Sequence, residues 1–187
     1  MKTAAPAPSP DEVARAIAEP VVLADYDPAW PAAAEAERSR LMRALPGTFV
    51  AIEHIGSTAV PGMRAKPLID LLAGVATLDG VFAFNAVAER VGYTTSPELN
   101  ASLTTRQWFM RQAGGRRTHH LHLVVHDGPE WHKRIDFRDL LRADPALRAR
   151  YVALKEGLAE RFNADREAYT EGKSAFITAT HDDGSAR

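Results

Sequence analysis

The sequence contains no cysteine. This absence excludes disulfide bonds and cysteine-ligated zinc, and it fits a reducing compartment, so we expect a cytoplasmic protein. No apolar run reaches the roughly 20 residues that a membrane-spanning helix needs. The first residues also lack the positive region and apolar core of a signal peptide. The sequence therefore predicts no membrane partner.

Neither sign of charge dominates, because 23 Lys and Arg residues face 24 Asp and Glu residues, for a formal net charge of -1. A dedicated nucleic-acid-binding domain is strongly basic, so we expect no nucleic-acid partner. The length of 187 residues predicts one domain. We expect residues 21–180 to form it, after a flexible and partly helical segment over 1–20 and before a frayed tail over 181–187.

Short apolar runs predict strands over 21–23, 49–52, 68–75, 104–111 and 118–126. Helical spacing predicts helices over 11–18, 32–45, 78–91, 130–142, 145–163 and 165–178. The charged residues of the helix over 32–45, among them Glu35 and Glu37, predict a solvent-facing surface. Strands followed by helices indicate an α+β fold, with a mixed or antiparallel sheet flanked by helices and further helices at the C-terminal end.

A loop with two glycines, two hydroxyls and two cations joins the two apolar runs around residues 54–72. Small residues such as Gly56 let a backbone approach a bulky anion, and loop N–H groups can bind phosphate oxygens. Gly56, Ser57 and Thr58 are therefore candidate phosphate-binding residues, with Lys66 as a neutralising cation. The alternative is a tight turn between two strands.

Asp70 lies inside an otherwise apolar strand. A carboxylate in such a place is costly unless it is paired or binds a metal. One interpretation is a site for Mg²⁺, which prefers oxygen ligands and keeps several waters. The alternative is a structural aspartate paired with an arginine or histidine, for example Arg117.

His120 and His122 are two residues apart in a predicted strand, so they share one face, while His119 lies on the other. Two adjacent imidazoles can ligate a transition metal, donate hydrogen bonds to phosphate or transfer protons. If this strand packs beside the strand of Asp70, the three residues form a candidate catalytic group. Asp70 and His122 are then the metal ligands. The alternative is a pair of hydrogen-bonded histidines that face solvent.

Several cations outside the loop could neutralise a polyphosphate, since arginine offers a bidentate fork and lysine a point charge. For each of them a solvated surface position is the alternative. Trp108 could stack a base, although core or edge packing is the more ordinary role of a tryptophan. The cations concerned are Arg106, Arg111, Arg116, Arg117 and Lys173.

The motifs over 54–62, 65–67 and 69–70 resemble those of the GrpB family, a group similar to the nucleotidyltransferase superfamily. The resemblance continues over 117–122, 137–142 and 165–169. It implies a nucleotidyltransferase-like fold in which Gly56 and Ser57 hold a nucleoside triphosphate and Asp70 binds Mg²⁺. The superfamily pattern places a second acid two residues after the first, where this sequence has Leu72.

This resemblance implies a protein that binds a nucleoside phosphate and transfers a nucleotidyl group to a small acceptor, with Mg²⁺ or Mn²⁺ as cofactor. Leu72 favours the alternative of a catalytically degenerate module for a nucleotide or a CoA-like phosphate. Members that resemble this family also occur fused to dephospho-CoA kinase, which suggests a link to nucleotide or CoA metabolism. A third interpretation is hydrolysis or transfer at a histidine-bound transition metal. The implied phosphate-binding residues are Gly56, Ser57, Thr58, Lys66, Arg117 and Lys173.

Overall fold

The computed structural model describes residues 11, 19–79, 84 and 88–185. Its centre is one sheet with the strand order β1-β2-β4-β3. The β1–β2 and β3–β4 pairs are antiparallel and the β2–β4 pair is parallel, so the sheet is mixed. The strands are β1 (Ala51–Ile55), β2 (Ile69–Val75), β3 (Gln107–Ala113) and β4 (Arg116–Val125).

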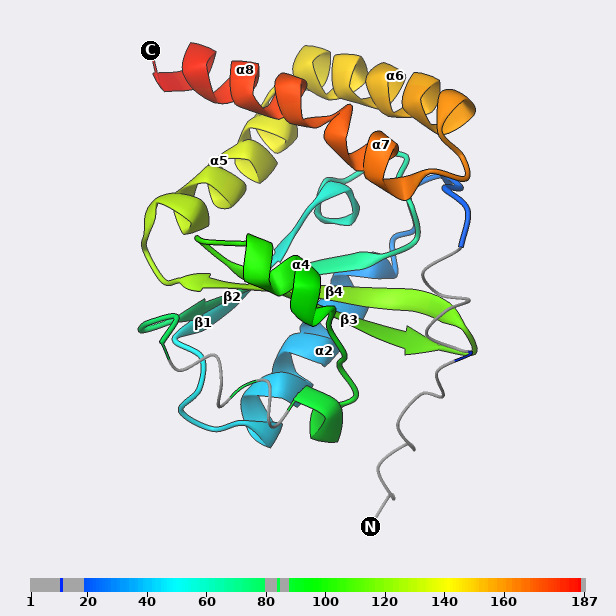
Figure 1. The fold of residues 1–187 in the computed structure, drawn as a ribbon. Helices are drawn as coiled ribbons and strands as arrows, with labels where there is room; N and C mark the ends of the chain where they lie inside the picture. Colours follow the sequence, from blue (N-terminus) through cyan, green and yellow to red (C-terminus); the bar gives the residue numbers. More distant parts are fainter. Residues whose placement is uncertain (1–10, 12–18, 80–83, 85–87, 186–187) are drawn as a thin grey trace.

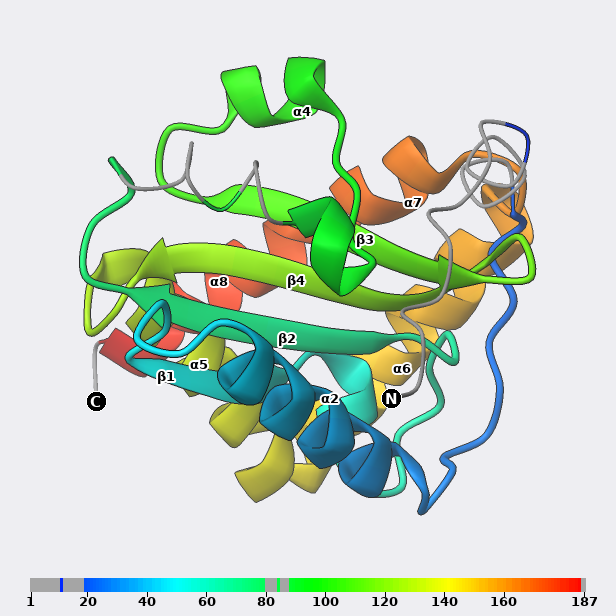
Figure 2. The same cartoon turned by 90° about the horizontal axis from the view of Figure 1, so that it is seen from below.

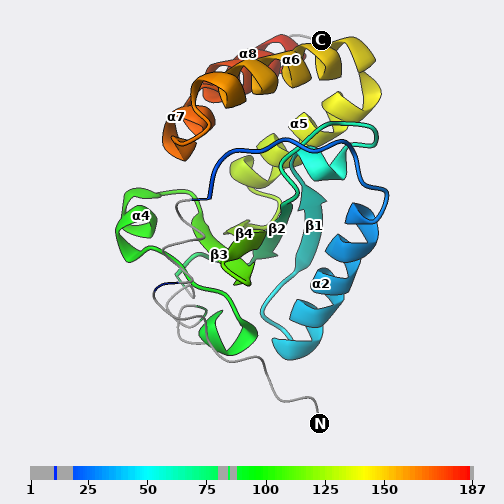
Figure 3. The same ribbon diagram turned by 90° about the vertical axis from the view of Figure 1, so that its right-hand side faces the viewer.

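Helices cover both faces of the sheet (Figures 1 and 3). The helix α2 (Trp30–Ala44) lies on one face, and α4 (Pro97–Ser102) lies beside β3 (Figure 2). The other face carries four C-terminal helices, as the sequence predicts for an α+β fold. They are α5 (Pro129–Ala143), α6 (Pro145–Arg161), α7 (Arg166–Glu171) and α8 (Ser174–Ser185).

The side chains of β2 alternate between two apolar layers. Leu71 and Leu121 pack with Leu41 of α2 in the larger core cluster. On the opposite face Leu72 packs with Trp131 of α5. Both layers exclude water from β2, which explains why its sequence is an almost continuous apolar run and why Asp70 stands out in it.

Aspartates begin two of the C-terminal helices. The Asp144 side chain accepts hydrogen bonds from two N–H groups in the first turn of α6, and Asp165 accepts one in α7. The helix predicted over 165–178 is instead two helices, separated by a turn at Gly172 and Lys173, and α8 continues through Ser185 into the predicted tail. Among the described residues, none of the helices combines the length and the apolar character needed to cross a membrane.

Two other expectations need revision. The strand predicted over 21–23 is absent, and Ala24 makes only an isolated bridge to Ala65. Most of the helix predicted over 78–91 lies outside the described residues. Its described end is the 3-10 helix η2 (Glu89–Val91), which stops at Gly92 in a left-handed conformation with φ of 76°.

The sequence predicts that Glu37 lies on the solvent-facing surface of α2. This prediction is wrong, because the Glu37 side chain is only 4% exposed. Its carboxylate accepts hydrogen bonds from Arg40 at 2.6 Å, Arg111 at 2.7 Å and the Tyr93 hydroxyl at 2.9 Å. Burial acts to raise the pKa of Glu37, but the bond from Arg40 and the charge of Arg111 lower it below its ordinary value. Glu37 therefore joins α2 to β3 as a buried anion.

We expect Glu37→Ala to lower the free energy of unfolding by about 1–3 kcal/mol, because it leaves the buried Tyr93 hydroxyl without its acceptor and removes the shared partner of two partly exposed arginines. Glu35→Ala is the matched control, since Glu35 lies on the same helix with a side chain that is 58% exposed and pairs with Arg38. Its loss should cost much less, because an exposed ion pair contributes little to stability. Urea denaturation measures both values, and equal losses would contradict a special role for Glu37.

Candidate active site

The parallel pairing of β2 with β4 places Asp70 directly opposite His120 and Leu72 opposite His122. Nδ1 of His120 lies 3.1 Å from Oδ1 of Asp70. The ring centroids of the two histidines are 6.3 Å apart. The strand pairing that the sequence leaves open thus brings Asp70, His120 and His122 to one place on the sheet.

This cluster has the donor set of a metal site. One ligand atom from each of Asp70, His120 and His122 lies within 4.8 Å of the others. Ligands about 2.1 Å from a metal ion lie within about 4.2 Å of each other. Small side-chain adjustments would therefore bring these three ligand atoms to metal-binding distance. Within the described part of the chain, Nε2 of His120 and Nδ1 of His122 are buried and have no hydrogen-bond partner. Burial also lowers the pKa of both imidazoles, which favours the neutral, ligating form.

Gly56 leaves room for the carboxylate of Asp70 on the loop side. Its φ of 72° is a left-handed conformation that favours glycine. A Cβ atom at Gly56 would lie 2.5 Å from Oδ2 of Asp70, so the backbone can approach the acid this closely only without a side chain. Desolvation acts to raise the pKa of Asp70, but the hydrogen bond from His120 and the charges of His120, His122 and Lys66 together outweigh it and lower the pKa. Asp70 is therefore a carboxylate.

Ser57 contacts a residue that the sequence analysis missed. Lys155 of α6 is only 2% exposed. Its ammonium donates hydrogen bonds to Oγ of Ser57 at 3.2 Å and to the carbonyl of Arg64. Burial lowers the pKa of Lys155 to about 7. Its position in a helix gave no sign of this role, because a lysine in a helix usually lies in solvent.

Two further lysines meet on one aromatic ring. Tyr169 of α7 is 1% exposed. The Nζ atoms of Lys66 and Lys173 lie 4.9 and 4.5 Å from the centre of its ring. Burial, followed by the charge of Lys173, lowers the pKa of Lys66 to about 7. We call Lys66, Lys155 and Lys173 the lysine cluster; Lys173 lies in the turn before α8 and not within a helix as predicted.

Thr58 is one of the residues that the sequence predicts to bind phosphate, but its hydroxyl makes internal hydrogen bonds instead. Its side chain is buried, donates a hydrogen bond to the carbonyl of Leu68 at 3.2 Å and contacts Nε2 of His54 at 2.9 Å. The hydroxyl therefore ties the 3-10 turn η1 (Ser57–Ala59) to the start of β2. Burial lowers the pKa of His54 to about 4, so the imidazole is neutral and donates this bond when Nε2 carries the proton.

The other arginines proposed from the sequence separate in space. Arg111 pairs with Glu37 on the opposite face of the sheet, so it is structural. Arg106 lies 3.7 Å from Glu130 of α5. The guanidinium of Arg117 lies 5.8 Å from the ring centre of Trp108, whose ring is 5.1 Å from that of His120. Trp108 thus lies beside the cluster on the same face of the sheet.

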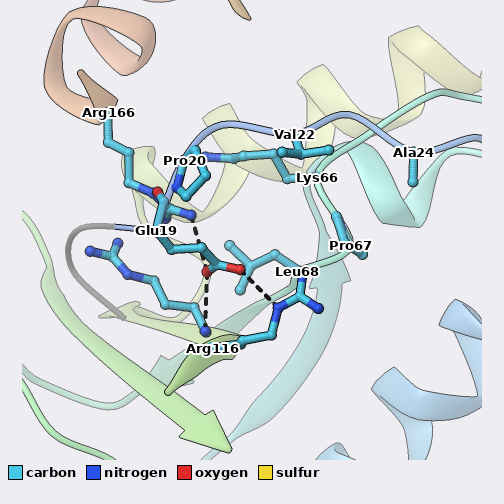
Figure 4. Close-up of a pocket in the computed structure, with 10 residues that line it drawn as sticks. Glu19, Pro20, Val22, Ala24, Lys66, Pro67, Leu68, Arg116 and Arg166 are labelled. Carbon is cyan, nitrogen blue, oxygen red and sulfur yellow. Dashed lines mark hydrogen bonds and ion pairs between the residues drawn. The ribbon is translucent and has the colours of Figure 1, made fainter. Parts of the chain in front are cut away.

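A cavity of about 410 Å³ opens beside Lys66 (Figure 4). Asp70 and the two histidines do not line it, but two of its lining residues connect it to the cluster. Lys66 interacts electrostatically with Asp70, and Arg117 lies over the ring of Trp108. We call it the arginine cavity. Its lining residues are Glu19, Pro20, Val22, Ala24, Lys66, Pro67, Leu68, Arg116, Arg117 and Arg166.

We expect Gly56→Ala to destabilise the protein more than Gly62→Ala. Both glycines have a left-handed φ, but a Cβ at Gly62 has no atom within 4 Å. The shared backbone cost is about 1–2 kcal/mol, and the contact with Asp70 adds about 1–3 kcal/mol at Gly56. Urea denaturation measures the difference. Equal losses of stability in the two variants would mean that the close approach of Gly56 to the Asp70 carboxylate does not require a glycine.

We expect Lys155→Met to flatten the pH dependence of stability. The unfolded chain keeps this proton up to pH 10.5 and the folded chain only to about 7, so unfolding takes up a proton between these values. The free energy of unfolding then rises with pH in this window, by up to about 1.4 kcal/mol per pH unit. Denaturation at several pH values should show a smaller slope in the variant, which keeps only the part due to Lys66, and parallel curves for the two proteins would contradict the burial of a titrating Lys155.

Comparisons with known proteins agree with the motifs. The GrpB protein family matches residues 20–183. A UPF0157 protein of Pseudomonas aeruginosa is 42% identical over 156 residues, which cover 81% of this chain and 62% of that protein. UPF0157 protein YqkA of Bacillus subtilis is 34% identical over 152 residues, which cover 81% of this chain and 43% of YqkA. A dephospho-CoA kinase of Mycolicibacterium paratuberculosis is 31% identical over 196 residues, 89% of this chain and 46% of the kinase. The chain thus spans less than two thirds of the length of each of these relatives.

Solved structures agree with the fold. The crystal structure of the conserved protein GrpB from Enterococcus faecalis has a TM-score of 0.76 and 33% identity, covering 87% of this chain and 96% of that one. The structure of Cid1 in complex with a UTP analogue is far less similar, with a TM-score of 0.46 and 13% identity, covering 88% of this chain and 47% of that one. From the match over residues 20–183 and the relatives above 30% identity, we conclude that this chain belongs to the GrpB family.

Proposed function

We propose that this chain binds the phosphate groups of a nucleoside phosphate beside a divalent metal ion held by Asp70, His120 and His122. The observation that carries the proposal is the buried cluster of one carboxylate and two imidazoles, with two ring nitrogens that lack a partner. Buried polar atoms without partners are rare and call for an explanation such as an ion. A metal ion would use both nitrogens.

The charge around the cluster supports a polyphosphate ligand. The lysine cluster supplies three ammonium groups, and Asp70 interacts with Lys66 and Lys173. At neutral pH the lowered pKa of Lys66 and Lys155 leaves part of each population uncharged. A bound polyphosphate favours the charged form, so binding takes up protons and weakens as the pH rises above about 7.

The ligand set favours Mn²⁺ over Mg²⁺. Imidazole nitrogen suits transition metals, whereas Mg²⁺ prefers oxygen ligands. When bound, the ion supplies Lewis-acid stabilisation of charge that develops on the reacting phosphate. Asp70 orients His120, the lysine cluster holds the outer phosphates, and Trp108 lies where a base could stack on its ring. This arrangement suits transfer of a nucleotidyl group to a small acceptor.

A second candidate function is binding without turnover. Leu72 occupies the position where the nucleotidyltransferase pattern has a second acid, and it is fully buried against Trp131. Two metal ions about 4 Å apart normally flank a transferred phosphoryl group. The one acid and two imidazoles of this cluster supply ligands for one metal ion. The related dephospho-CoA kinase suggests a CoA-like phosphate as an alternative ligand for such a module.

Calorimetric titration with Mn²⁺, and then with ATP, tests the proposal. We expect Asp70→Asn and His122→Gln each to weaken Mn²⁺ binding beyond the roughly 10- to 100-fold loss typical of second-layer residues. His132→Gln is the matched control, because this histidine is 54% exposed and contacts Asp127. Unchanged Mn²⁺ affinity in the first two variants would remove the metal site. ATP binding with Mn²⁺ that releases no pyrophosphate with any acceptor tried would favour the binding module.

A further inference from the structure

The carboxylate of Glu19 lies in the arginine cavity (Figure 4). It accepts hydrogen bonds from Nε of Arg116 at 3.2 Å, from Nη2 of Arg166 at 3.3 Å and from the N–H of Arg117 at 3.3 Å. The carbonyl of Glu19 also accepts a bond from Nε of Arg166 at 2.6 Å. One carboxylate from the start of the chain therefore contacts donors from β4 and α7.

Glu19 does not use all the donors that face it. The side chain of Arg166 is 15% exposed, and its Nη1 atom is buried without a partner among the described residues. The three bonds to the carboxylate are also long for charge-assisted hydrogen bonds, which are typically about 2.7–2.9 Å. A ligand with more oxygen atoms would satisfy these donors better than Glu19 does.

The charge of the cavity points to an anion. Four of its lining residues are cations and one is acidic, while the others, such as Pro67 and Leu68, are apolar. Lys66 lines the cavity and also interacts electrostatically with Asp70. An occupant of the cavity would therefore lie next to the phosphates of a nucleotide bound at the lysine cluster. This is the place that a second substrate would take.

We propose that the arginine cavity is the subsite of the acceptor. It binds an oxyanion of this molecule between Arg116 and Arg166. Glu19 occupies the place of this anion until the acceptor binds. The oxyanion is a phosphoryl or carboxylate group. Naming the occupant as the acceptor rests on the proposed function, whereas oxyanion binding at this place does not. Binding displaces Glu19 and supplies oxygen atoms for Nη1 of Arg166.

Calorimetric titration of the full chain with inorganic phosphate and, separately, with acetate tests this assignment in the presence of EDTA. Removing the internal competitor in Glu19→Gln should lower the Kd for one of these anions by about tenfold, the factor expected if Glu19 occupies the site in about nine of ten molecules. Adding Arg166→Gln should abolish the gain. The control is Glu35→Gln, which makes the same charge change at an exposed position on α2.

A gain for phosphate assigns a phosphorylated acceptor, and a gain for acetate assigns a carboxylate. Equal Kd values for Glu19→Gln and Glu35→Gln would overturn the proposal, and so would a gain that survives Arg166→Gln. Because EDTA removes divalent ions, this result is independent of the Mn²⁺ titrations. Failure of the metal site leaves the oxyanion site standing, and failure here leaves the metal site standing.

Discussion

The parallel hydrogen-bonded pairing of β2 with β4 is the interaction on which the candidate site depends. It places Asp70 opposite His120, and His122 one step further along the same face. A slip of one residue would turn the imidazoles towards the layer that holds Leu121 and Leu123. That layer packs against α2, so the apolar side chains of the core fix the register that assembles the polar cluster.

The site balances opposing electrostatic effects. Burial of Lys66 and Lys155 disfavours their charge, so in the absence of an anion the two lysines destabilise the fold. The same burial excludes water that would otherwise screen their attraction for a phosphate. Glu37 resolves a comparable problem differently on the far side of the sheet, where two arginines and a tyrosine satisfy one carboxylate permanently. One face is thus closed and structural, and the other carries the proposed ligand site.

The sequence predicted those parts of the structure that local pattern determines. Alternation placed His120 and His122 on one face, and an acid within an apolar run identified Asp70. The sequence did not predict the features that depend on contacts between residues far apart in the chain. The charges of α2 gave no sign that Glu37 is buried, since its partners come from residues 93 and 111. Lys155 was missed for the same reason, because its contacts lie 91 and 98 positions away. The roles of the site residues remain predictions.

The break between α7 and α8 has a consequence for the order in which the site is completed. Lys173 lies in this turn and Tyr169 in the helix before it, and the ring of Tyr169 contacts both Lys173 and Lys66. During synthesis the strands that carry Asp70 and His120 leave the ribosome well before these residues. A nascent chain can therefore form its sheet while the lysine cluster is still incomplete, and the proposed phosphate ligand could bind only once the final helices have formed.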